Sequence, residues 1–447
     1  MSVLIRSVQR FHLILLIGIL LNAPMNFEST LRAQQNIHPE QLANEILADT
    51  TLTHVLELAQ DLLRSGLNAG SSYGEVWIRD LNTFVELALD VQEPEQIRNS
   101  LLTFFHFQGE EGNIIDGYIP KANANVGYDY IESDSRPDLL GHKNTVETDQ
   151  ESSLIQAMYK YVEKTGDRSI LHEQIGGFTV TERLDKALQF LMDYRYNREF
   201  GLLWGATTVD WGDVQPEHEW GVVLDESSHK AVDIYDNAMF VVALKNYTEL
   251  VGPAGLNYEK WTNQAVQIRK SVREYLWLPL IHKFIPHIYL DASPFPAWFD
   301  EYRIHYHGGT AVAIEADILG QKEIATVYNH MANNMHFAGA ASIGLTVYPP
   351  YPDGFFKNPS MKPFSYQNGG DWTWFGGRMI QQLIRYGFIA EAYNSLQPMI
   401  TRVIANDGFY EWYSVENEPR GSGTFRGSAS VLGKAITMLT NWANEQK

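Results

Sequence analysis

Residues 233–276 decide the predicted fold, and they read DIYDNAMFVVALKNYTELVGPAGLNYEKWTNQAVQIRKSVREYL. Apolar residues recur at spacings of three and four in 233–250 and again in 258–276. This spacing is typical of amphipathic helices. Because only a short connection separates the two segments, they are predicted to pack as an antiparallel helical hairpin.

The same spacing recurs along most of the chain, which predicts roughly a dozen helices in about six hairpins. The predicted helices are 40–64, 80–90, 94–107, 148–164, 181–195, 233–250, 258–276, 309–319, 321–336, 372–386, 388–404 and 428–445. Extended segments are few and short, namely 114–119, 202–208 and 284–290. We therefore expect an all-α fold, a closed (α/α)6 toroid of inner and outer helices with long loops at one end. A solenoid is the alternative, but no fixed sequence period supports it.

The composition narrows the function classes. The chain has 447 residues, of which 45% are hydrophobic and 20% charged, so it is a globular protein able to bury one large core or two moderate ones. Its formal charge of −20, with no local run of lysine or arginine, makes nucleic acid a poor partner. Cysteine is absent, which excludes disulfides, thiolate metal sites and thiol nucleophiles. His305 and His307 lack further ligands in the sequence around them, so we predict neither a metal site nor a cofactor.

The N-terminus has the order of a secretory signal. Arg6 and Arg10 precede an apolar stretch over 13–21, and small or polar residues follow up to Ala33. The apolar stretch is shorter than the ~20 residues that span a bilayer. We expect a signal peptide over 1–33 and a single catalytic domain over 34–447. The mature protein is then periplasmic or secreted, with no stable membrane insertion once the signal is removed.

Two acidic segments rich in aromatic residues lie far apart in the chain, Val209–Asp213 (VDWGD) and Tyr410–Tyr413 (YEWY). Aromatic rings stack on the apolar faces of sugars, while carboxylates accept hydrogen bonds from hydroxyl groups or move protons at a glycosidic oxygen. The long connections 109–147, 196–232, 277–308 and 337–371 are also of the kind that carries function. The sequence therefore predicts a carbohydrate-active enzyme whose partner is an oligosaccharide or glycoside.

A resemblance to a known superfamily rests on several motifs in order. They are Trp77–Asp80 (WIRD), Asp116–Pro120 (DGYIP), Glu147–Asp149 (ETD), Tyr366–Gly370 (YQNGG) followed by Trp372, and Glu411 before a Gly-Ser-Gly loop. In this order the chain resembles the six-hairpin glycosidases over roughly residues 70–435. That superfamily has an (α/α)6 barrel and includes glucoamylases, trehalases, processing and debranching α-glucosidases, and exo-acting α-mannosidases. The resemblance implies an inverting, exo-acting α-glycosidase for glucosides or mannosides.

Inversion requires a general acid and a general base on opposite walls of the pocket, with room for a water molecule. In the resembled enzymes the acid comes from the loop after the middle hairpins and the base from a position near the last helix. This maps onto Asp210 or Asp213 for the acid and onto Glu411 for the base. We favour Asp213 because Gly212 precedes it and allows a tight turn. Asp210 would then bind a hydroxyl group.

Further residues are predicted to bind substrate. Arg79, Asp80, Glu147 and Asp149 stand at predicted helix starts, and the resemblance implies that they hold the terminal sugar. Their structural alternatives are a buried ion pair or helix caps. Loop aromatics are predicted to stack on sugar, and Asn368 lies in a glycine-rich bend that lets backbone approach a ligand. The ring and bend candidates are Trp77, Trp211, Trp372, Trp412 and Asn368, and Trp204, Trp298 and Trp374 also lie in or next to the loops.

Two other functions remain open at this point. A polysaccharide lyase or unsaturated-uronyl hydrolase can use the same toroid, but it needs basic residues around a uronate and these loops are acidic. A non-catalytic glycan-binding protein would use the carboxylates only as acceptors. The sequence does not distinguish hydrolysis from phosphorolysis, because related toroids include phosphorylases.

Overall fold

The computed structural model describes residues 38–124 and 129–447. The predicted signal peptide over 1–33 lies outside the described residues. None of the helices in the described ranges is both long and apolar enough to span a membrane.

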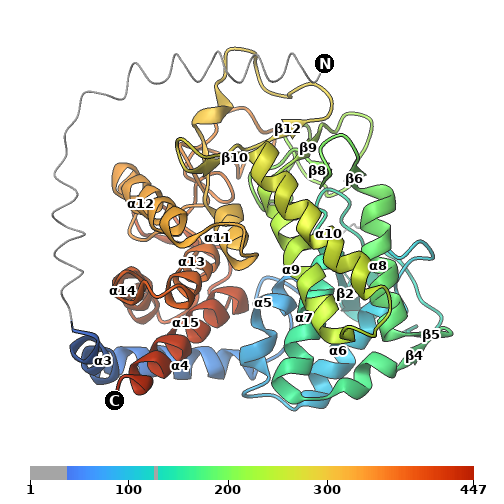
Figure 1. The fold of residues 1–447 in the computed structure, drawn as a ribbon, viewed down its shortest axis with the longest axis horizontal. Helices are drawn as coiled ribbons and strands as arrows, with labels where there is room; N and C mark the ends of the chain where they lie inside the picture. The colour runs from blue at the N-terminus through green and yellow to red at the C-terminus, as the bar shows by residue number, and fades with distance from the viewer. Residues whose placement is uncertain (1–37, 125–128) are drawn as a thin grey trace.

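Six inner helices form a ring. They are α5 (Ile78–Ala88), α7 (Gln150–Thr165), α9 (Ile234–Val251), α11 (His307–Glu315), α13 (Thr373–Arg385) and α15 (Arg426–Glu445). Each packs against the next, and α15 packs against α5, which closes the ring (Figure 1). The inner helices are buried on nearly all sides, so α9 and α11 are apolar around most of their circumference.

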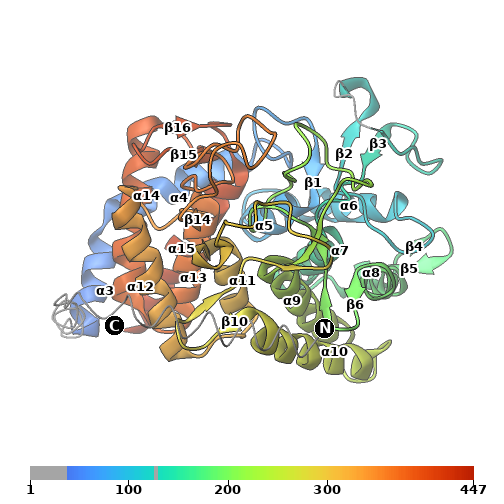
Figure 2. The ribbon, with the colours of Figure 1, turned by 90° about the horizontal axis from the view of Figure 1, so that it is seen from above.

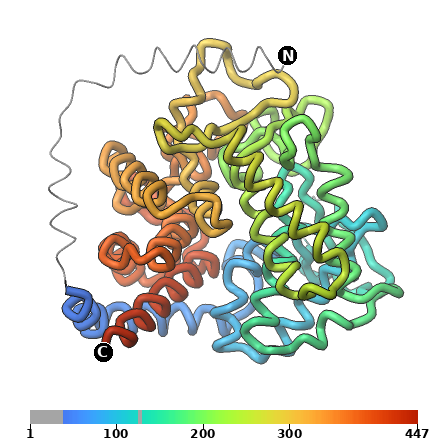
Figure 3. Tube along the Cα trace, viewed as in Figure 1, coloured from blue at the N-terminus to red at the C-terminus, as the bar shows by residue number. Residues whose placement is uncertain are grey.

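The outer helices alternate with the inner ones along the chain. They are α4 (Thr50–Leu63), α6 (Pro94–His106), α8 (Val180–Tyr194), α10 (Tyr258–Ser271), α12 (Gln321–Ala338) and α14 (Ile389–Asn406), with α3 (Pro39–Ala48) added beside α15. Each outer helix buries one face and exposes the other, which is the amphipathic pattern seen in the sequence. Figure 3 traces the N-terminal helices beside the C-terminal one, and α4 packs directly on α15. The predicted (α/α)6 toroid is confirmed.

The predicted helices differ from the observed ones by more than two residues in three places. The segment 309–319 is observed as α11, which ends at Glu315. The segment 40–64 is divided into α3 and α4 because Asp49 leaves the helical conformation and its carboxylate caps α4 by accepting from the amide of Thr51. The segment 258–276 ends as an α-helix at Ser271 and continues as a single π-turn, Val272–Leu276.

The strands are short and lie in the loops. They are β1 (Val76–Trp77), β2 (Gly117–Pro120), β3 (Leu139–His142), β4 (Gln174–Ile175), β5 (Phe178–Thr179), β6 (Tyr196–Asn197), β7 (Leu202–Leu203), β8 (Gly205–Ala206), β9 (Lys230–Val232), β10 (Trp277–Leu278), β11 (Lys283–Phe284), β12 (Ile288–Tyr289), β13 (His305–Tyr306), β14 (Val347–Tyr348), β15 (Trp412–Tyr413) and β16 (Pro419–Arg420). Each predicted extended segment overlaps at least one of them.

Most of these strands build one end of the ring, whereas β4 and β5 connect the C-terminal end of α7 to α8. The antiparallel sheet β1–β2–β3 and the hairpin β15–β16 lie on the same side of the helical body (Figure 2). Short strands or loops lead into the N-termini of α5, α9, α11 and α13, so the starts of the inner helices face this end. The predicted site segments are thereby gathered from distant parts of the chain.

Candidate active site

A cavity of about 530 Å³ opens among these loops at the N-terminal end of the inner ring. It is lined by Ala69, Tyr73, Trp77, Arg79, Asp80, Asp116, His142, Trp211, Asp213, Val214, Gln215, His218, Glu219, Trp220, Gly221, Val222, Asn358, Ser360, Tyr366, Gln367, Trp372, Trp374, Glu411 and Phe425. Both Asp213 and Glu411 are among these residues, although they are far apart in sequence. A volume of this size accommodates a sugar unit with part of a leaving group.

Asp213 reaches the cavity from the long loop between β8 and β9. Its Oδ1 accepts a hydrogen bond of 2.8 Å from Nε2 of Gln367. Gly212 makes this approach feasible, because a Cβ there would lie 2.4 Å from the amide oxygen of Gln367. Gly212 was predicted to allow a tight turn. In the structure, its missing side chain allows Gln367 to pack closely beside Asp213.

Asp210 does not line the cavity. It is buried, has a φ of +56°, and accepts hydrogen bonds of 2.9 and 3.0 Å from the Gly309 amide at the start of α11. The positive end of the helix dipole favours a carboxylate at this place. Burial raises the pKa of Asp210 to about 7, although the amides of Gly309 and Gly308 oppose the rise. Asp210 therefore anchors the loop that presents Asp213.

Glu411 reaches the cavity from the residue before β15. Its Oε1 accepts from the Tyr73 hydroxyl at 3.0 Å, and its Oε2 accepts from the Ser422 amide at 3.2 Å. Burial raises the pKa of Glu411; these two donors oppose the rise and the charge of Asp213 adds to it. The two candidate catalytic carboxylates thus interact electrostatically inside one cavity. A base with a raised pKa is a stronger proton acceptor in its ionised form.

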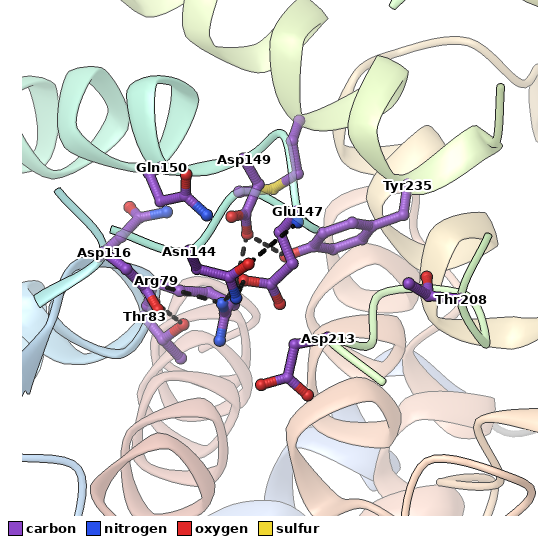
Figure 4. A network of polar contacts seen from close by, with 12 residues as sticks. Arg79, Thr83, Asp116, Asn144, Glu147, Asp149, Gln150, Thr208, Asp213 and Tyr235 are labelled. Atoms are coloured by element: carbon purple, nitrogen blue, oxygen red, sulfur yellow. Dashed lines mark hydrogen bonds and ion pairs between the residues drawn. The ribbon is translucent and has the colours of Figure 1, made fainter. Parts of the chain in front are cut away.

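Arg79 lies at the centre of a cluster of carboxylates beside Asp213 (Figure 4). Its guanidinium donates to Asp149 Oδ2 at 3.1 Å and to Glu147, and lies 3.6 Å from Asp116 Oδ1. Glu147 and Asp149 do not line the cavity, so in this structure they hold Arg79. We call Arg79 with Asp80, Asp116, Glu147 and Asp149 the Arg79 cluster.

The Arg79 cluster has more negative charge than Arg79 can balance. Burial raises the pKa of Asp80 to about 7 and that of Asp116 to about 7, although Arg79 opposes both shifts. Within the described residues, the buried Oδ1 atoms of Asp80 and Asp116 have no hydrogen-bond partner. Both residues line the cavity, so their carboxyl groups lie where a ligand's hydroxyl groups would meet the Arg79 cluster.

Aromatic rings form a large part of the cavity wall. Trp211 packs edge-on against Trp372 with ring centroids 4.8 Å apart, and lies 5.3 Å from Trp374. Trp77 lies opposite His142, with ring centroids 5.9 Å apart and nearly perpendicular planes. These rings provide apolar surface on which a pyranose can stack.

Three predicted loop residues lie elsewhere. Trp412 does not line the cavity; it packs near Tyr366. Asn368 is fully buried and bonds to the backbone of Tyr351 and Met361, so it holds the bend in which it was predicted to contact ligand. Trp298 is 73% exposed and packs against phenylalanines away from the cavity.

Several lining residues were not identified from the sequence. Tyr73, His142 and Trp220 carry no recognisable motif and come from loops whose paths only the fold reveals. Gln367 lay inside the quoted YQNGG motif, but its contact with Asp213 depends on the bend's conformation. Among residues 38–124 and 129–447, no group of three His, Cys, Asp or Glu side chains is arranged to hold a metal ion.

Comparison with known proteins shows the family of the chain. The chain belongs to the glycosyl hydrolase 94 superfamily, since the model of that superfamily's catalytic domain matches residues 49–285. The six-hairpin glycosidase resemblance is thereby confirmed, and the protein is a glycosidase-type enzyme that acts on carbohydrate. No curated protein sequence matches the chain significantly.

Solved structures share the fold at low sequence identity. The GH63 mannosylglycerate hydrolase from Thermus thermophilus, in complex with Tris and D-glycerate, matches with a TM-score of 0.61 and 16% identity over 85% of this chain and 99% of that one. A rhamnosidase from Klebsiella oxytoca with rhamnose bound matches with a TM-score of 0.56 and 13% identity over 86% of this chain and 63% of that one. A GH78 rhamnosidase of Bacillus sp. GL1 matches with a TM-score of 0.57 and 14% identity over 86% and 34%.

Proposed function

We propose that this member of the superfamily is an inverting, exo-acting glycoside hydrolase for neutral α-linked glucosides or mannosides. The observation that carries the proposal is that Asp213 and Glu411, from separate loops, line the same cavity. Asp213 is the general acid and Glu411 the general base. Their carboxyl groups are expected to lie about 6.5–9.5 Å apart in the substrate complex, which leaves room for a water molecule.

In the reaction, Glu411 accepts a proton from water while the water oxygen attacks the anomeric carbon. The bond from that carbon to the glycosidic oxygen breaks, and its electron pair stays on the leaving oxygen, which takes the proton of Asp213. The product sugar has inverted configuration at the anomeric carbon. The Tyr73 hydroxyl and the Ser422 amide hold the Glu411 carboxylate during this step.

The Arg79 cluster supports binding of a terminal sugar. Asp80 and Asp116 both line the cavity, and their carboxyl groups suit adjacent hydroxyl groups of a sugar. The indoles of Trp77 and Trp211 add apolar wall next to them. Trp220 also lines the cavity and is 67% exposed, so it can contact a leaving group.

The charge of the cavity supports water, rather than phosphate, as the acceptor. Within the described lining, Arg79 is the only arginine or lysine, and carboxylates surround it. A phosphate ion would meet Asp80, Asp213 and Glu411 without a free cation to balance it. The same argument disfavours a uronate substrate, and therefore a lyase, and it disfavours an anionic leaving group such as glycerate.

A panel of α-linked disaccharides tests the proposal. Purified protein is incubated with each sugar with and without phosphate, and proton NMR follows the anomeric signal of the first product. The expected result is release of free sugar with inverted configuration and no sugar phosphate. Sugar phosphate, a retained configuration or an unsaturated product would each contradict the proposal, and binding without turnover would favour a non-catalytic protein.

We also propose that the protein is exported, on the order of Arg6, the apolar stretch 13–21 and Ala33 in the sequence. Protein recovered from its native host should begin close to Gln34. N-terminal sequencing that finds Met1 would contradict export.

A further inference from the structure

A general acid must offer its proton on the oxygen that faces the substrate. A protonated carboxyl group has one hydroxyl oxygen and one carbonyl oxygen, and only the hydroxyl oxygen can donate. If the proton sits on the oxygen turned away from the glycosidic bond, the acid must rearrange before it reacts. A neighbour that always donates to one oxygen removes this ambiguity.

Gln367 is such a neighbour of Asp213. It is 1% exposed, lines the cavity, and donates from Nε2 to Oδ1 of Asp213 at 2.8 Å. Because this donor occupies Oδ1, that oxygen is the better carbonyl acceptor, and the proton belongs on Oδ2. Figure 4 shows the carboxylate of Asp213 projecting from its loop into the space beside the Arg79 cluster.

The backbone around Gln367 is fixed independently of the acid. The carbonyl of Gln367 accepts from the Thr346 hydroxyl at 2.7 Å, and the carbonyl of Tyr366 accepts from the indole of Trp372 at 2.8 Å. Tyr366 itself has a φ of +46°, in the left-handed region that non-glycine residues seldom adopt. A bend held in this conformation by its neighbours is characteristic of a functional position.

Close packing leaves the amide little freedom. A Cβ at Gly212 would lie 2.4 Å from Oε1 of Gln367 and 2.8 Å from its amide carbon. Oε1 is buried without a hydrogen-bond partner in the described structure. The only hydrogen bond found for the side chain is therefore the one to Asp213, which is the expected arrangement if that contact is the role of Gln367.

We propose that Gln367 is a positioning residue that fixes the catalytic proton on Oδ2 of Asp213. This inference rests on the proposed function, in which Asp213 is the general acid. In the reaction, the proton passes from Oδ2 to the leaving oxygen as the glycosidic bond breaks. The resulting carboxylate keeps its Oδ1 contact with the amide, and a solvent proton restores the acid.

The test is the pH dependence of kcat/KM for two variants, Gln367→Met and Gln367→Glu. Methionine keeps the length of the side chain but cannot donate. An amide donor favours the ionised form of the acid that it contacts. Its loss in Gln367→Met should therefore move the alkaline limb of the kcat/KM profile, where the general acid loses its proton, to higher pH by about one unit. Glutamate adds a like charge beside Asp213, so its limb should move further in the same direction.

The leaving group provides a second readout. Gln367→Met should lower kcat on the best disaccharide of the panel by ~10-fold, and by less than ~2-fold on the dinitrophenyl glycoside of the same sugar, which needs little protonation. Gln381→Met is the matched control, because the amide of the buried Gln381 in α13 donates to the backbone oxygen of Val431 at 2.9 Å and Gln381 does not line the cavity. It should lower the melting temperature without moving the limb.

The outcomes are separable. An unmoved or lowered limb in both variants, or equal losses on both leaving groups, would overturn the role of Gln367 while leaving the hydrolase in place. An unaltered enzyme that hydrolyses none of the panel sugars would overturn the proposed function and this inference together.

Discussion

The two ends of the inner helical ring hold buried or partly buried charge in opposite ways. At the loop end, the Arg79 cluster sets four carboxylates around one guanidinium. Deeper in the ring lies what we call the deep charge cluster, made of Glu86, Lys160, Glu315, Arg378 and Lys434. There the charges are nearly balanced, with three cationic side chains and two acidic ones.

The balance is visible in the pKa values. In the deep charge cluster, burial acts to raise the pKa of Glu86 and of Glu315, but the neighbouring cations outweigh it and both are lowered. At the loop end burial prevails, and the pKa of Asp80 rises to about 7. Helix α5 carries both situations, with Asp80 in its first turn and Glu86 near its end. We interpret the paired charges of the deep charge cluster as part of the fold's stability, and the excess carboxylates of the Arg79 cluster as a feature of a ligand-binding site.

The largest expected effect comes from removing the base. Glu411→Gln should lower turnover by ~10² or more with little loss of stability, because it removes general base catalysis and neutralises a buried charge. Steady-state kinetics and thermal melting check this. Glu418→Gln is the control, since Glu418 is exposed on the neighbouring strand hairpin. Near-normal hydrolysis by Glu411→Gln would contradict the assignment.

The next largest effect is expected from removing a cation of the deep charge cluster. Arg378→Met should destabilise the protein by ~3 kcal/mol, because Glu315, which accepts from Arg378 at 3.1 Å, loses its direct partner. Arg385→Met on the same helix should cost less than ~1 kcal/mol, since its ion pair with Asp317 is partly solvated. Urea unfolding measures both. Equal costs for the two variants would show that burial does not distinguish the pairs.

The sequence predicted the ring but not this division of charge. Helix spacing is a local property, so the residues of α9 and α10 alone reveal a hairpin. Whether a buried carboxylate has a partner depends on other helices. Arg79 was a candidate for sugar contact or an ion pair, and the structure gives it direct ion pairs with Glu147 and Asp149.

The choice of the general acid shows the same limit of sequence-based prediction. Val209–Asp213 offered two acid candidates that sequence could not separate with certainty, because their environments are set by distant residues. Asp210 is held by α11, and only Asp213 lines the cavity. The structure provides what the motif lacked, namely which carboxylate is used to hold the loop.

The excess of carboxylates in the Arg79 cluster should make the free energy of unfolding fall as pH rises. In the folded protein the pKa of Asp80 and of Asp116 is about 7, above the usual value near 4, so the folded state binds protons more tightly than the unfolded state. Their stabilising contribution is complete below about pH 4 and is lost as pH rises through about 7.

Thermal melting between pH 5 and 8 measures this effect. Asp80→Asn should flatten the dependence because it removes one of the titrating groups, whereas Asp138→Asn, at an exposed ion pair, should leave it unchanged. A melting temperature that increases over this range, or an unflattened profile for Asp80→Asn, would refute the explanation.

The smallest expected effect concerns Tyr73, whose hydroxyl donates to Glu411 at 3.0 Å. This donor opposes the burial that raises the pKa of Glu411, so Tyr73→Phe should raise that pKa further. A base acts only when ionised, and the acid limb of kcat/KM should therefore move to higher pH, by roughly half a unit to one unit. Activity well above the limb should change by only a few fold, since the Ser422 amide still holds Oε2 at 3.2 Å.

Tyr410→Phe is the control, because Tyr410 neighbours Glu411 in sequence but does not line the cavity. If the acid limb stays in place in Tyr73→Phe, or moves to lower pH, Glu411 is not the group that titrates there. A different residue of the cavity would then be the general base.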